Sequence, residues 1–282
     1  MILNPVTIDI RSSHVMAIVN LTPDSFYASS RHASYAAVRE SVERAVRDGA
    51  TIVDLGGYSS RPGAEVVSVD EEWRRVEMGL QAVRDAEVDV VVSIDTFRSE
   101  VVRRAYAGYG AFIVNDISAG EADKAMVDVV AELGLPYVAM HMRGTPETMQ
   151  SLTGYEDGVT KGVVDYFRER VRVLETAGIA RENIILDPGF GFAKTTEQNF
   201  RLLAGLAALR DLGYPLLIGL SRKSMIYRPL GITSQEALPG SLALAWEALR
   251  GGEAIVRVHD VAATHQVVEL ANYYKRVGYD KG

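Results

Sequence analysis

The chain has no cysteine among its 282 residues, so it forms no disulfide bond. It also has no thiolate for metal binding, iron–sulfur ligation or nucleophilic catalysis. The sequence contains no run of about 18 apolar residues, the length that a membrane-spanning helix needs, and its first fifteen residues lack the basic start and apolar centre of a signal peptide. We therefore expect a cytoplasmic protein that does not associate with a membrane.

The sequence also has fewer basic than acidic residues. Lys and Arg number 30 against 37 Asp and Glu, which gives a formal net charge of −7. Proteins that bind nucleic acid usually present a basic surface, so no nucleic-acid partner is predicted. An anionic small molecule stays compatible with this balance, because a local cluster of basic side chains can act against the overall sign.

Eight short apolar runs, rich in β-branched residues, alternate with longer amphipathic stretches. The runs cover residues 14–20, 51–57, 88–96, 112–118, 136–142, 183–189, 215–221 and 254–260. Continuous apolarity is typical of strands that are buried on both faces. The alternation predicts a single (β/α)8 barrel domain over residues 1–282, with a doubly wound open sheet as the alternative.

Three glycines support this division into elements. Gly49, Gly134 and Gly178 each follow an amphipathic stretch and come a few residues before the next apolar run. Glycine commonly ends a helix because it adopts the left-handed conformation without a Cβ clash. We therefore expect a helix to end at each of them.

Nearly every apolar run ends in a polar side chain or a glycine. In chain order these are Asn20, Gly56 and Gly57, Asp95, Asn115 and Asp116, His141, Asp187, Ser221, and Arg257 with His259. In parallel α/β folds the active site lies at the carboxyl ends of the strands, so we expect these residues to gather at one end of the barrel. The alternative is that they only mark where each strand leaves the core.

Seven motifs closely resemble those of the dihydropteroate synthase family. They are NLTPDSF (20–26), GGYSSRPGAE (56–65), SIDT (93–96), NDIS (115–118), DPGFGFAKT (187–195), GLSRKS (219–224) and RVHD (257–260). The resemblance implies a (β/α)8 barrel and a transferase of folate biosynthesis. That enzyme joins 6-hydroxymethyl-7,8-dihydropterin diphosphate to 4-aminobenzoate and forms 7,8-dihydropteroate and diphosphate. The resemblance also implies Mg²⁺, a homodimer and a sulfonamide target.

The pterin part of the substrate calls for buried carboxylates. Its 2-amino-4-oxo edge presents N–H donors that one carboxylate accepts in parallel. Asp95 and Asp187 each end an apolar run, where an ionised carboxylate needs a ligand or a cation. An N-cap or an ion pair with a nearby Arg is the alternative for both. The resemblance implies that Asp187 binds the pyrimidine edge, and that Asp95 and Asn115 complete the hydrogen bonding.

Four further residues are expected at the pterin. The resemblance implies pterin contacts for Lys223, Met140, Phe192 and Ile117. Met140, Phe192 and Ile117 are suited to form apolar walls for the flat ring. For Met140 and Ile117, however, ordinary core packing is the interpretation that their residue types favour.

The diphosphate requires positive charge. Arg257 and His259 are two residues apart at the end of the last run, so they lie on the same face of the strand. Both donate hydrogen bonds suited to phosphate oxygens. The resemblance implies that they bind the diphosphate together with Ser60 and Asn20, and that Asn20 holds Mg²⁺. Asp24 is a further metal ligand to consider.

The 4-aminobenzoate carboxylate requires donors as well. Residues 221–224 end a strand and open a helix, whose free N–H groups suit an anion, and Ser224 adds a hydroxyl. The other residues that the resemblance assigns to this substrate are Phe26, Arg61, Pro62 and Lys223.

The residues present indicate a displacement without a covalent enzyme intermediate, because neither a cysteine nor an evident Ser–His–acid arrangement is found. The difficult step is the departure of diphosphate, which positive charge stabilises. The resemblance implies a dissociative displacement, and we expect Arg257, His259, Lys223 and Asp95 to be the catalytic residues.

Two alternatives stay open. A corrinoid-dependent methyltransferase is also a pterin-binding barrel, but it expels no diphosphate, so Arg257, His259 and residues 221–224 argue against it. A non-catalytic pterin-binding protein is the other, and the presence of all the expected site residues argues against it.

Overall fold

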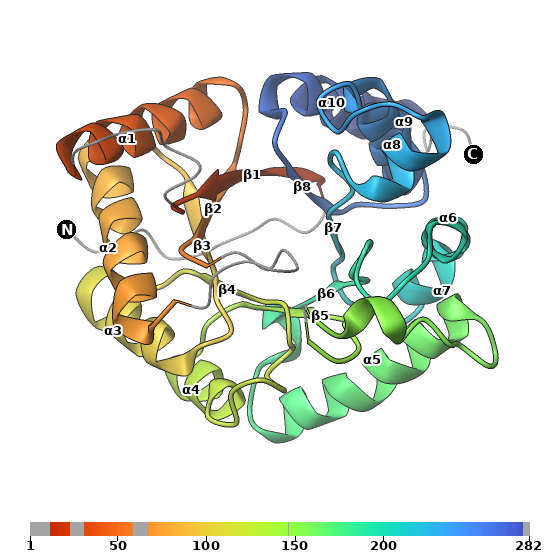
Figure 1. Ribbon diagram of the computed structural model, residues 1–282, viewed down its shortest axis with the longest axis horizontal. Helices are drawn as coiled ribbons and strands as arrows, with labels where there is room; N and C mark the ends of the chain where they lie inside the picture. The colour runs from red at the N-terminus through yellow and green to blue at the C-terminus, as the bar shows by residue number, and fades with distance from the viewer. Residues whose placement is uncertain (1–11, 23–30, 59–66, 146, 279–282) are drawn as a thin grey trace.

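The computed structural model describes residues 12–22, 31–58, 67–145 and 147–278. Within them eight parallel strands stand at the centre and helices surround them (Figure 1). The strands are β1 (His14–Asn20), β2 (Ile52–Gly56), β3 (Val91–Asp95), β4 (Ile113–Asp116), β5 (Tyr137–Met140), β6 (Ile184–Asp187), β7 (Leu217–Ile218) and β8 (Ile255–Val258).

The sheet closes on itself. Its strand order is β6-β5-β4-β3-β2-β1-β8-β7, so the first and last strands of the chain are neighbours. A parallel bridge between Leu186 and Leu216 joins the two ends of this order. The (β/α)8 barrel is therefore confirmed, and the open-sheet alternative is wrong because an open sheet keeps two unpaired edges.

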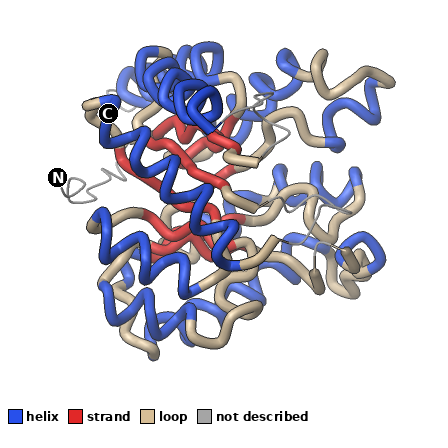
Figure 2. The backbone as a smooth tube through the Cα atoms, turned by 60° about the vertical axis from the view of Figure 1, so that its left-hand side comes forward, coloured by secondary structure: helices blue, strands red, loops and turns tan. Residues whose placement is uncertain are grey.

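Helices form the outer ring (Figure 2). They are α1 (Arg31–Arg47), α2 (Val69–Ala86), α3 (Ser99–Tyr109), α4 (Met126–Leu133), α5 (Val159–Thr176), α6 (Thr196–Ala204), α7 (Leu206–Arg210), α8 (Ser224–Leu230), α9 (Leu238–Arg250) and α10 (Val261–Gly278). Among the helices of the described ranges, none is long and apolar enough to cross a membrane.

The three glycines end helices as expected. Gly134 caps α4 in the left-handed conformation, and its N–H donates to the carbonyl groups of Val130 and Ala131. Gly49 and Gly178 follow α1 and α5 with φ of 102° and 100°. These conformations favour glycine because it has no Cβ.

The seventh apolar run is shorter as a strand than the sequence indicates. Residues 215–221 yield only the two-residue β7, next to the single bridge that closes the barrel. Continuous apolarity shows that a segment is buried, and it does not show how much of it is hydrogen-bonded to a neighbour.

A layer of apolar side chains fills the barrel interior on the side nearer the amino ends of the strands. Its buried members are Met16, Ile52, Ile113, Val138, Ile185, Leu217 and Ile255, with the partly buried Val91 packed against them. Each strand contributes one residue, and most of the remaining buried apolar side chains form a separate cluster. The barrel therefore has a solid interior at this level, and a site has room only nearer the carboxyl ends of its strands.

Candidate active site

The next layer of the barrel interior is polar. Side chains alternate along a strand, so the residue two positions beyond each apolar-layer residue faces the same interior. These residues are Ile18, Asp54, Ser93, Asn115, Met140, Asp187, Gly219 and Arg257. Four charged or amide side chains and a hydroxyl thus replace the aliphatic groups of the layer below.

Arg257 stands at the centre of this layer. Its Nε donates to Oδ2 of Asp54 over 2.6 Å, and its Nη2 donates to Oδ2 of Asp95 over 2.8 Å. Asp54 is fully buried and also accepts hydrogen bonds from Ser93 (2.6 Å) and Asn115 (3.1 Å). β2, β3, β4 and β8 are thereby joined around one guanidinium.

These ion pairs shift the ionisation of both partners. Burial raises the pKa of Asp95 to about 7, against the pull of Arg257, and the charge of Asp54 adds to the rise. Burial on its own would lower the pKa of Arg257, but Asp54 and Asp95 outweigh it and raise that pKa. Arg257 is therefore a permanent cation, whereas Asp95 titrates near neutral pH.

Asp187 and Lys223 are two further buried charges, and each influences the ionisation of the other. Burial raises the pKa of Asp187, and Lys223 opposes this rise. Burial lowers the pKa of Lys223 to about 8, and Asp187 opposes that fall. The ammonium group of Lys223 donates to the carbonyl of Phe190 and lies 5.0 Å from the centre of the Phe192 ring.

His259 and Ser221 meet at the barrel mouth. The hydroxyl Oγ of Ser221 lies 3.0 Å from Nδ1 of His259 and accepts the His259 backbone N–H. Arg222 follows Ser221 in the chain, but its guanidinium donates to both carboxylate oxygens of Asp260. Its charge is therefore used in this ion pair rather than in the site.

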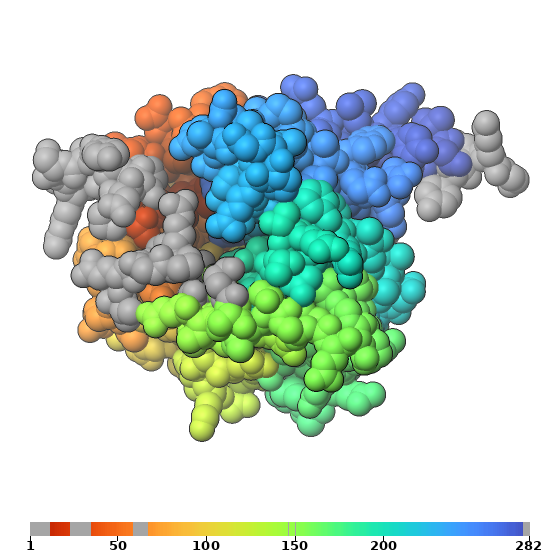
Figure 3. All heavy atoms as spheres, turned by 45° about the vertical axis from the view of Figure 1, so that its right-hand side comes forward, coloured from red at the N-terminus to blue at the C-terminus, as the bar shows by residue number. Residues whose placement is uncertain are grey.

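Ser224 lies at a polar pocket on the rim. The pocket has a volume of about 340 Å³ and is lined by Thr153, Gly191, Lys194, Thr195, Thr196, Asn199, Ser224 and Arg228. Figure 3 shows the segments before α5, around α6 and in α8, in green, teal and blue, gathered on one face. Hydroxyl, amide and cationic groups suit a polar or anionic group there.

Oxygen ligands meet beside Gly56. A Cβ added to Gly56 would lie 3.8 Å from Oδ1 of Asn20 and 3.9 Å from Oδ2 of Asp95. Two hard oxygen donors therefore lie near Gly56, and one of them, Oδ2 of Asp95, also accepts from Arg257. Such donors fit Mg²⁺, which commonly binds few protein groups and keeps water or phosphate oxygens.

The other predicted residues fall into two groups. Met140 and Ile117 are buried, with exposed fractions of 3% and 8%, but belong to neither hydrophobic cluster of the core. Their burial fits either a core position or the wall of a site. The predicted residues Asp24, Phe26, Ser60, Arg61 and Pro62 lie outside the described residues.

Sequence reasoning missed Asp54 and Ser93 as site residues. A signal was present, because Asp54 interrupts the apolar run 51–57 and a buried carboxylate requires partners. Only the strand register shows which residue is its partner, because Asp54 lies opposite Ser93 in the pairing of β2 with β3.

Sequence reasoning also missed the contact between Lys194 and His141, which lie at the loops after β6 and β5. The ammonium group of Lys194 contacts Nδ1 of His141 and the carbonyl oxygens of Gly189 and Phe192, each over 2.9 Å. Both side chains are almost fully buried. His141 was noted at a strand end and Lys194 stands in a recognised motif, but neither was given a role.

The chain matches one protein family over most of its length. A family described as "Pterin binding enzyme" matches residues 16–259. Dihydropteroate synthase of Escherichia coli K12 is 43% identical over 264 residues, which cover 94% of this chain and 92% of that protein.

Solved structures agree. Dihydropteroate synthase of Yersinia pestis, in a complex with a sulfonamide drug, superposes with a TM-score of 0.88 at 35% identity and covers 98% of this chain and 99% of its own. The Xanthomonas albilineans enzyme with 4-aminobenzoic acid gives a TM-score of 0.84 at 38% identity, covering 95% and 94%. A further structure of that enzyme contains 7,8-dihydropteroate, with a TM-score of 0.82 at 36% identity and coverage of 96% and 95%.

Proposed function

The chain belongs to the pterin-binding enzyme family, among the dihydropteroate synthases, and we propose that the polar end of its barrel carries out their reaction. A pterin diphosphate is joined to 4-aminobenzoate, and diphosphate is released. The observation that carries the proposal is the charged end of the barrel, where Asp54, Asp187 and Arg257 of the polar layer lie with Asp95 and Lys223 above the apolar layer.

The pterin lies across this layer. Asp187 accepts from the pyrimidine edge, and Asp95 and Asn115 supply the remaining polar contacts. The apolar walls come from Met140 and Ile117, which are both buried, and Met140 lies in the polar layer of the barrel interior. Support for this orientation is the placement of both carboxylates within a water-poor interior, where hydrogen bonds to an N–H edge are strong.

The displacement breaks the bond between the pterin methylene carbon and the diphosphate oxygen. The electron pair leaves with the oxygen, and the 4-aminobenzoate nitrogen then forms a bond to the methylene and loses a proton to water. Nη1 of Arg257 takes part in neither ion pair, so the guanidinium can donate to the departing oxygens while Asp54 and Asp95 hold it. Lys223 adds positive charge at the mouth, and His259 can donate a hydrogen bond in either protonation state.

Mg²⁺ fits the leaving-group side of the site. Asn20 would hold it through Oδ1, beside Gly56, and the bound ion would neutralise charge on the departing diphosphate. In the described part of the chain, no three His, Asp or Glu side chains cluster to hold an ion by themselves. The diphosphate itself would then complete the coordination.

4-Aminobenzoate occupies the rim beside Phe192 and Ser224. Ser224 lines the polar pocket, and the Lys223 ammonium near the Phe192 ring connects this pocket with the pterin side. Phe26, Arg61, Pro62 and Ser60 stay predictions for the two substrates, as does a cytoplasmic location.

A diphosphate-release assay tests the proposed function. The purified protein is given the pterin diphosphate, 4-aminobenzoate and Mg²⁺, and both diphosphate and dihydropteroate are quantified. Equal amounts of the two products are expected. Transfer of a methyl group from methyltetrahydrofolate to a corrinoid protein, or pterin binding without product, would instead support one of the two alternatives.

Asp95 should give the reaction a dependence on pH. Its pKa is raised to about 7 by burial, so lowering the pH below 7 protonates a carboxylate that must accept hydrogen bonds from the pterin. We expect kcat/KM for the pterin diphosphate to fall below pH 7, towards about tenfold per pH unit. Rate profiles from pH 5.5 to 8.5 measure this effect.

The control is Asp95→Asn, which cannot titrate. Its kcat/KM should be low at every pH and should lack the acidic limb, apart from the ionisation of the substrate itself. A wild-type profile that stays flat between pH 5.5 and 7 would contradict this role of Asp95.

A homodimer is proposed through α10. Leu270, Tyr273 and Val277 lie on this helix with exposed fractions of 62%, 58% and 52%, and large exposed apolar groups gathered on one helix are typical of an interface. Leu270→Asp should therefore shift the protein from dimer to monomer in light scattering.

The matched control is Leu230→Asp, because Leu230 on α8 is equally exposed at 61% but lies on another element. It should leave the mass unchanged. A wild-type protein that is monomeric at micromolar concentration would contradict the proposed dimer.

A further inference from the structure

The loop between β6 and α6, residues 188–195, has an unusual backbone that needs external support. Gly189 and Gly191 have φ of 67° and 84°, and Ala193 has φ of 50°. The left-handed conformation is strained for a non-glycine residue such as Ala193, because its Cβ crowds the backbone. A Cβ on Gly189 would lie 2.0 Å from the His141 carbonyl oxygen, so the loop also packs tightly against the end of β5.

Two lysines hold the carbonyl groups of this loop. Lys194 donates to Gly189 and Phe192, and Lys223 donates to Phe190. The oxygens of the turn therefore face ammonium groups rather than water. Lys223 is part of the reaction site, whereas Lys194 lies behind the loop with only 4% of its surface exposed.

The ammonium group of Lys194 has its full set of partners. An ammonium has three protons to donate, and three acceptors lie 2.9 Å away, namely the two carbonyls and Nδ1 of His141. Burial lowers the pKa of Lys194 to about 7, and Asp187 opposes this fall. Where Lys194 is protonated and donates to Nδ1, His141 is neutral with its proton on Nε2. This agrees with its lowered pKa of about 2, which burial and the nearby cations Lys194 and Arg143 cause.

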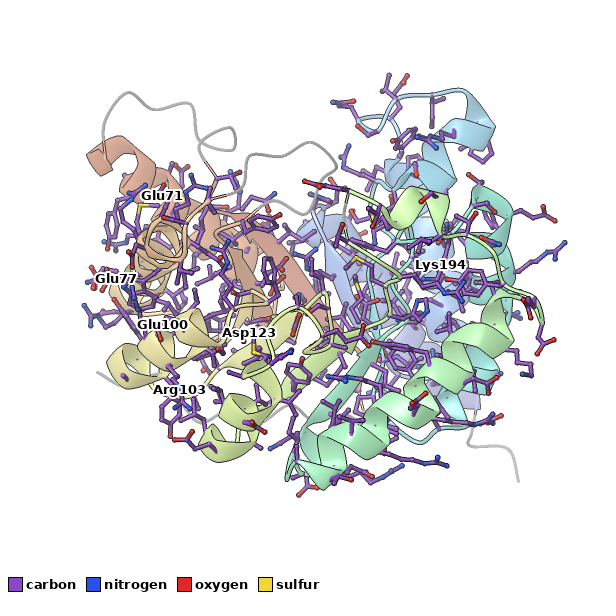
Figure 4. The ribbon with its side chains drawn as sticks, turned by 60° about the horizontal axis from the view of Figure 1, so that its bottom comes forward. Glu71, Glu77, Glu100, Arg103, Asp123 and Lys194 are labelled. Carbon is purple, nitrogen blue, oxygen red and sulfur yellow. The ribbon has the colours of Figure 1, made fainter. Side chains whose placement is uncertain are left out.

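The loop carries groups that the reaction needs at fixed positions. Asp187 directly precedes it and accepts the Gly189 N–H over 2.8 Å. Phe192 lies against Lys223, and Gly191 and Lys194 line the rim pocket. Figure 4 places Lys194 within the body of the molecule, on the other side from Glu71, Glu77 and Glu100 of α2 and α3.

We propose that Lys194, held by His141, is a positioning residue that sets the β6–α6 loop so that Asp187 and Phe192 meet the pterin and the aromatic amine. The proposal rests on the proposed function. Lys194 lines the rim pocket, but the three acceptors of its ammonium group are His141 and the carbonyls of Gly189 and Phe192. Its ammonium group fixes the carbonyl groups of a strained loop whose other face forms the site, and His141 orients that ammonium from β5.

The test compares Lys194→Met, which keeps the length of the side chain and removes its donors, with Lys161→Met on the exposed face of α5. Lys194→Met should raise KM for the pterin diphosphate about tenfold or more, as displacement of a positioning group does, while kcat changes less than threefold. Deuterium uptake by peptides covering residues 187–195 should rise. Lys161→Met should leave KM, kcat and the deuterium uptake of this loop unchanged.

His141 supplies a second pair of variants. His141→Asn keeps an acceptor near the position of Nδ1 and should stay close to wild type, whereas His141→Leu removes it and should reproduce Lys194→Met. Unchanged KM and deuterium uptake in both Lys194→Met and His141→Leu would overturn the proposal. A large fall in kcat at unchanged KM would also overturn it, because Lys194 would then act on the reacting groups.

Deuterium uptake and calorimetric binding of the pterin diphosphate do not depend on turnover. A wild-type protein that makes no dihydropteroate would refute the proposed function, while loss of loop protection and of pterin binding in Lys194→Met would still support the positioning role. If Lys194→Met melts below the assay temperature, the two His141 variants decide the question.

Discussion

Replacing Arg257 with Met is expected to lower kcat/KM by about 10²- to 10³-fold, the effect of removing one charged group that stabilises a transition state. The same change should lower the free energy of unfolding by about 3–5 kcal/mol, because it leaves the buried carboxylate of Asp54 without its cation. Steady-state rates and urea denaturation measure the two effects.

A double variant separates the two roles of Arg257. Asp54→Asn in the Arg257→Met background removes the unpaired charge, so much of the stability should return while turnover stays low. Arg257→Lys keeps the charge but not the fork that reaches both Asp54 and Asp95, and it should be intermediate. Wild-type turnover in Arg257→Met would show that the guanidinium does not act on the leaving group.

Replacing Asp187 with Asn is the second change for which we expect a large effect, here on the affinity for the pterin diphosphate. Asn keeps the size of the side chain and an oxygen for the Gly189 N–H, but it loses the charge that faces the pterin edge. A charge-assisted hydrogen bond contributes about 1.5–3 kcal/mol, so we expect binding of the pterin diphosphate to weaken about 10- to 100-fold in calorimetry.

Stability shows whether this loss is specific. Burial raises the pKa of Asp187, which means that folding disfavours its ionised form at neutral pH. A neutral Asn should therefore melt no lower than the wild type at pH 8, even though binding is weakened. Asp165→Asn, on the exposed face of α5, should bind normally. Unchanged affinity in Asp187→Asn would show that another group holds the pyrimidine edge.

The strand ends could be predicted from the sequence because apolar runs stop where the chain leaves the core. Asp95, Asn115, Asp187 and Arg257 were identified in this way, and the structure brings them to one end of the barrel. The resemblance added the chemistry that this placement serves, since position alone does not distinguish a pterin from another ligand.

The pairings within the barrel could not be predicted. Arg257 and Asp54 are 203 residues apart in the chain, and only the closure and stagger of the sheet bring them together. The same limit applies to Lys194 and His141, which belong to different loops. The short β7 was also hidden, because burial of residues 215–221 does not reveal where the ladder stops.

The charges inside the barrel balance one another. Among the described residues discussed above, Asp54, Asp95 and Asp187 are opposed by Lys194, Lys223 and Arg257 when all six are ionised. Near neutral pH the loss of charge from Asp95 is matched by a loss from Lys194, because both have a pKa of about 7. A diphosphate entering this neutral interior imports negative charge into a region of low dielectric constant, so its binding is coupled to the uptake of protons or metal ions. The enthalpy of binding should therefore vary with the ionisation enthalpy of the buffer. The affinity of the enzyme for its substrate thus depends on the concentrations of protons and metal ions in the solution as well as on its own side chains.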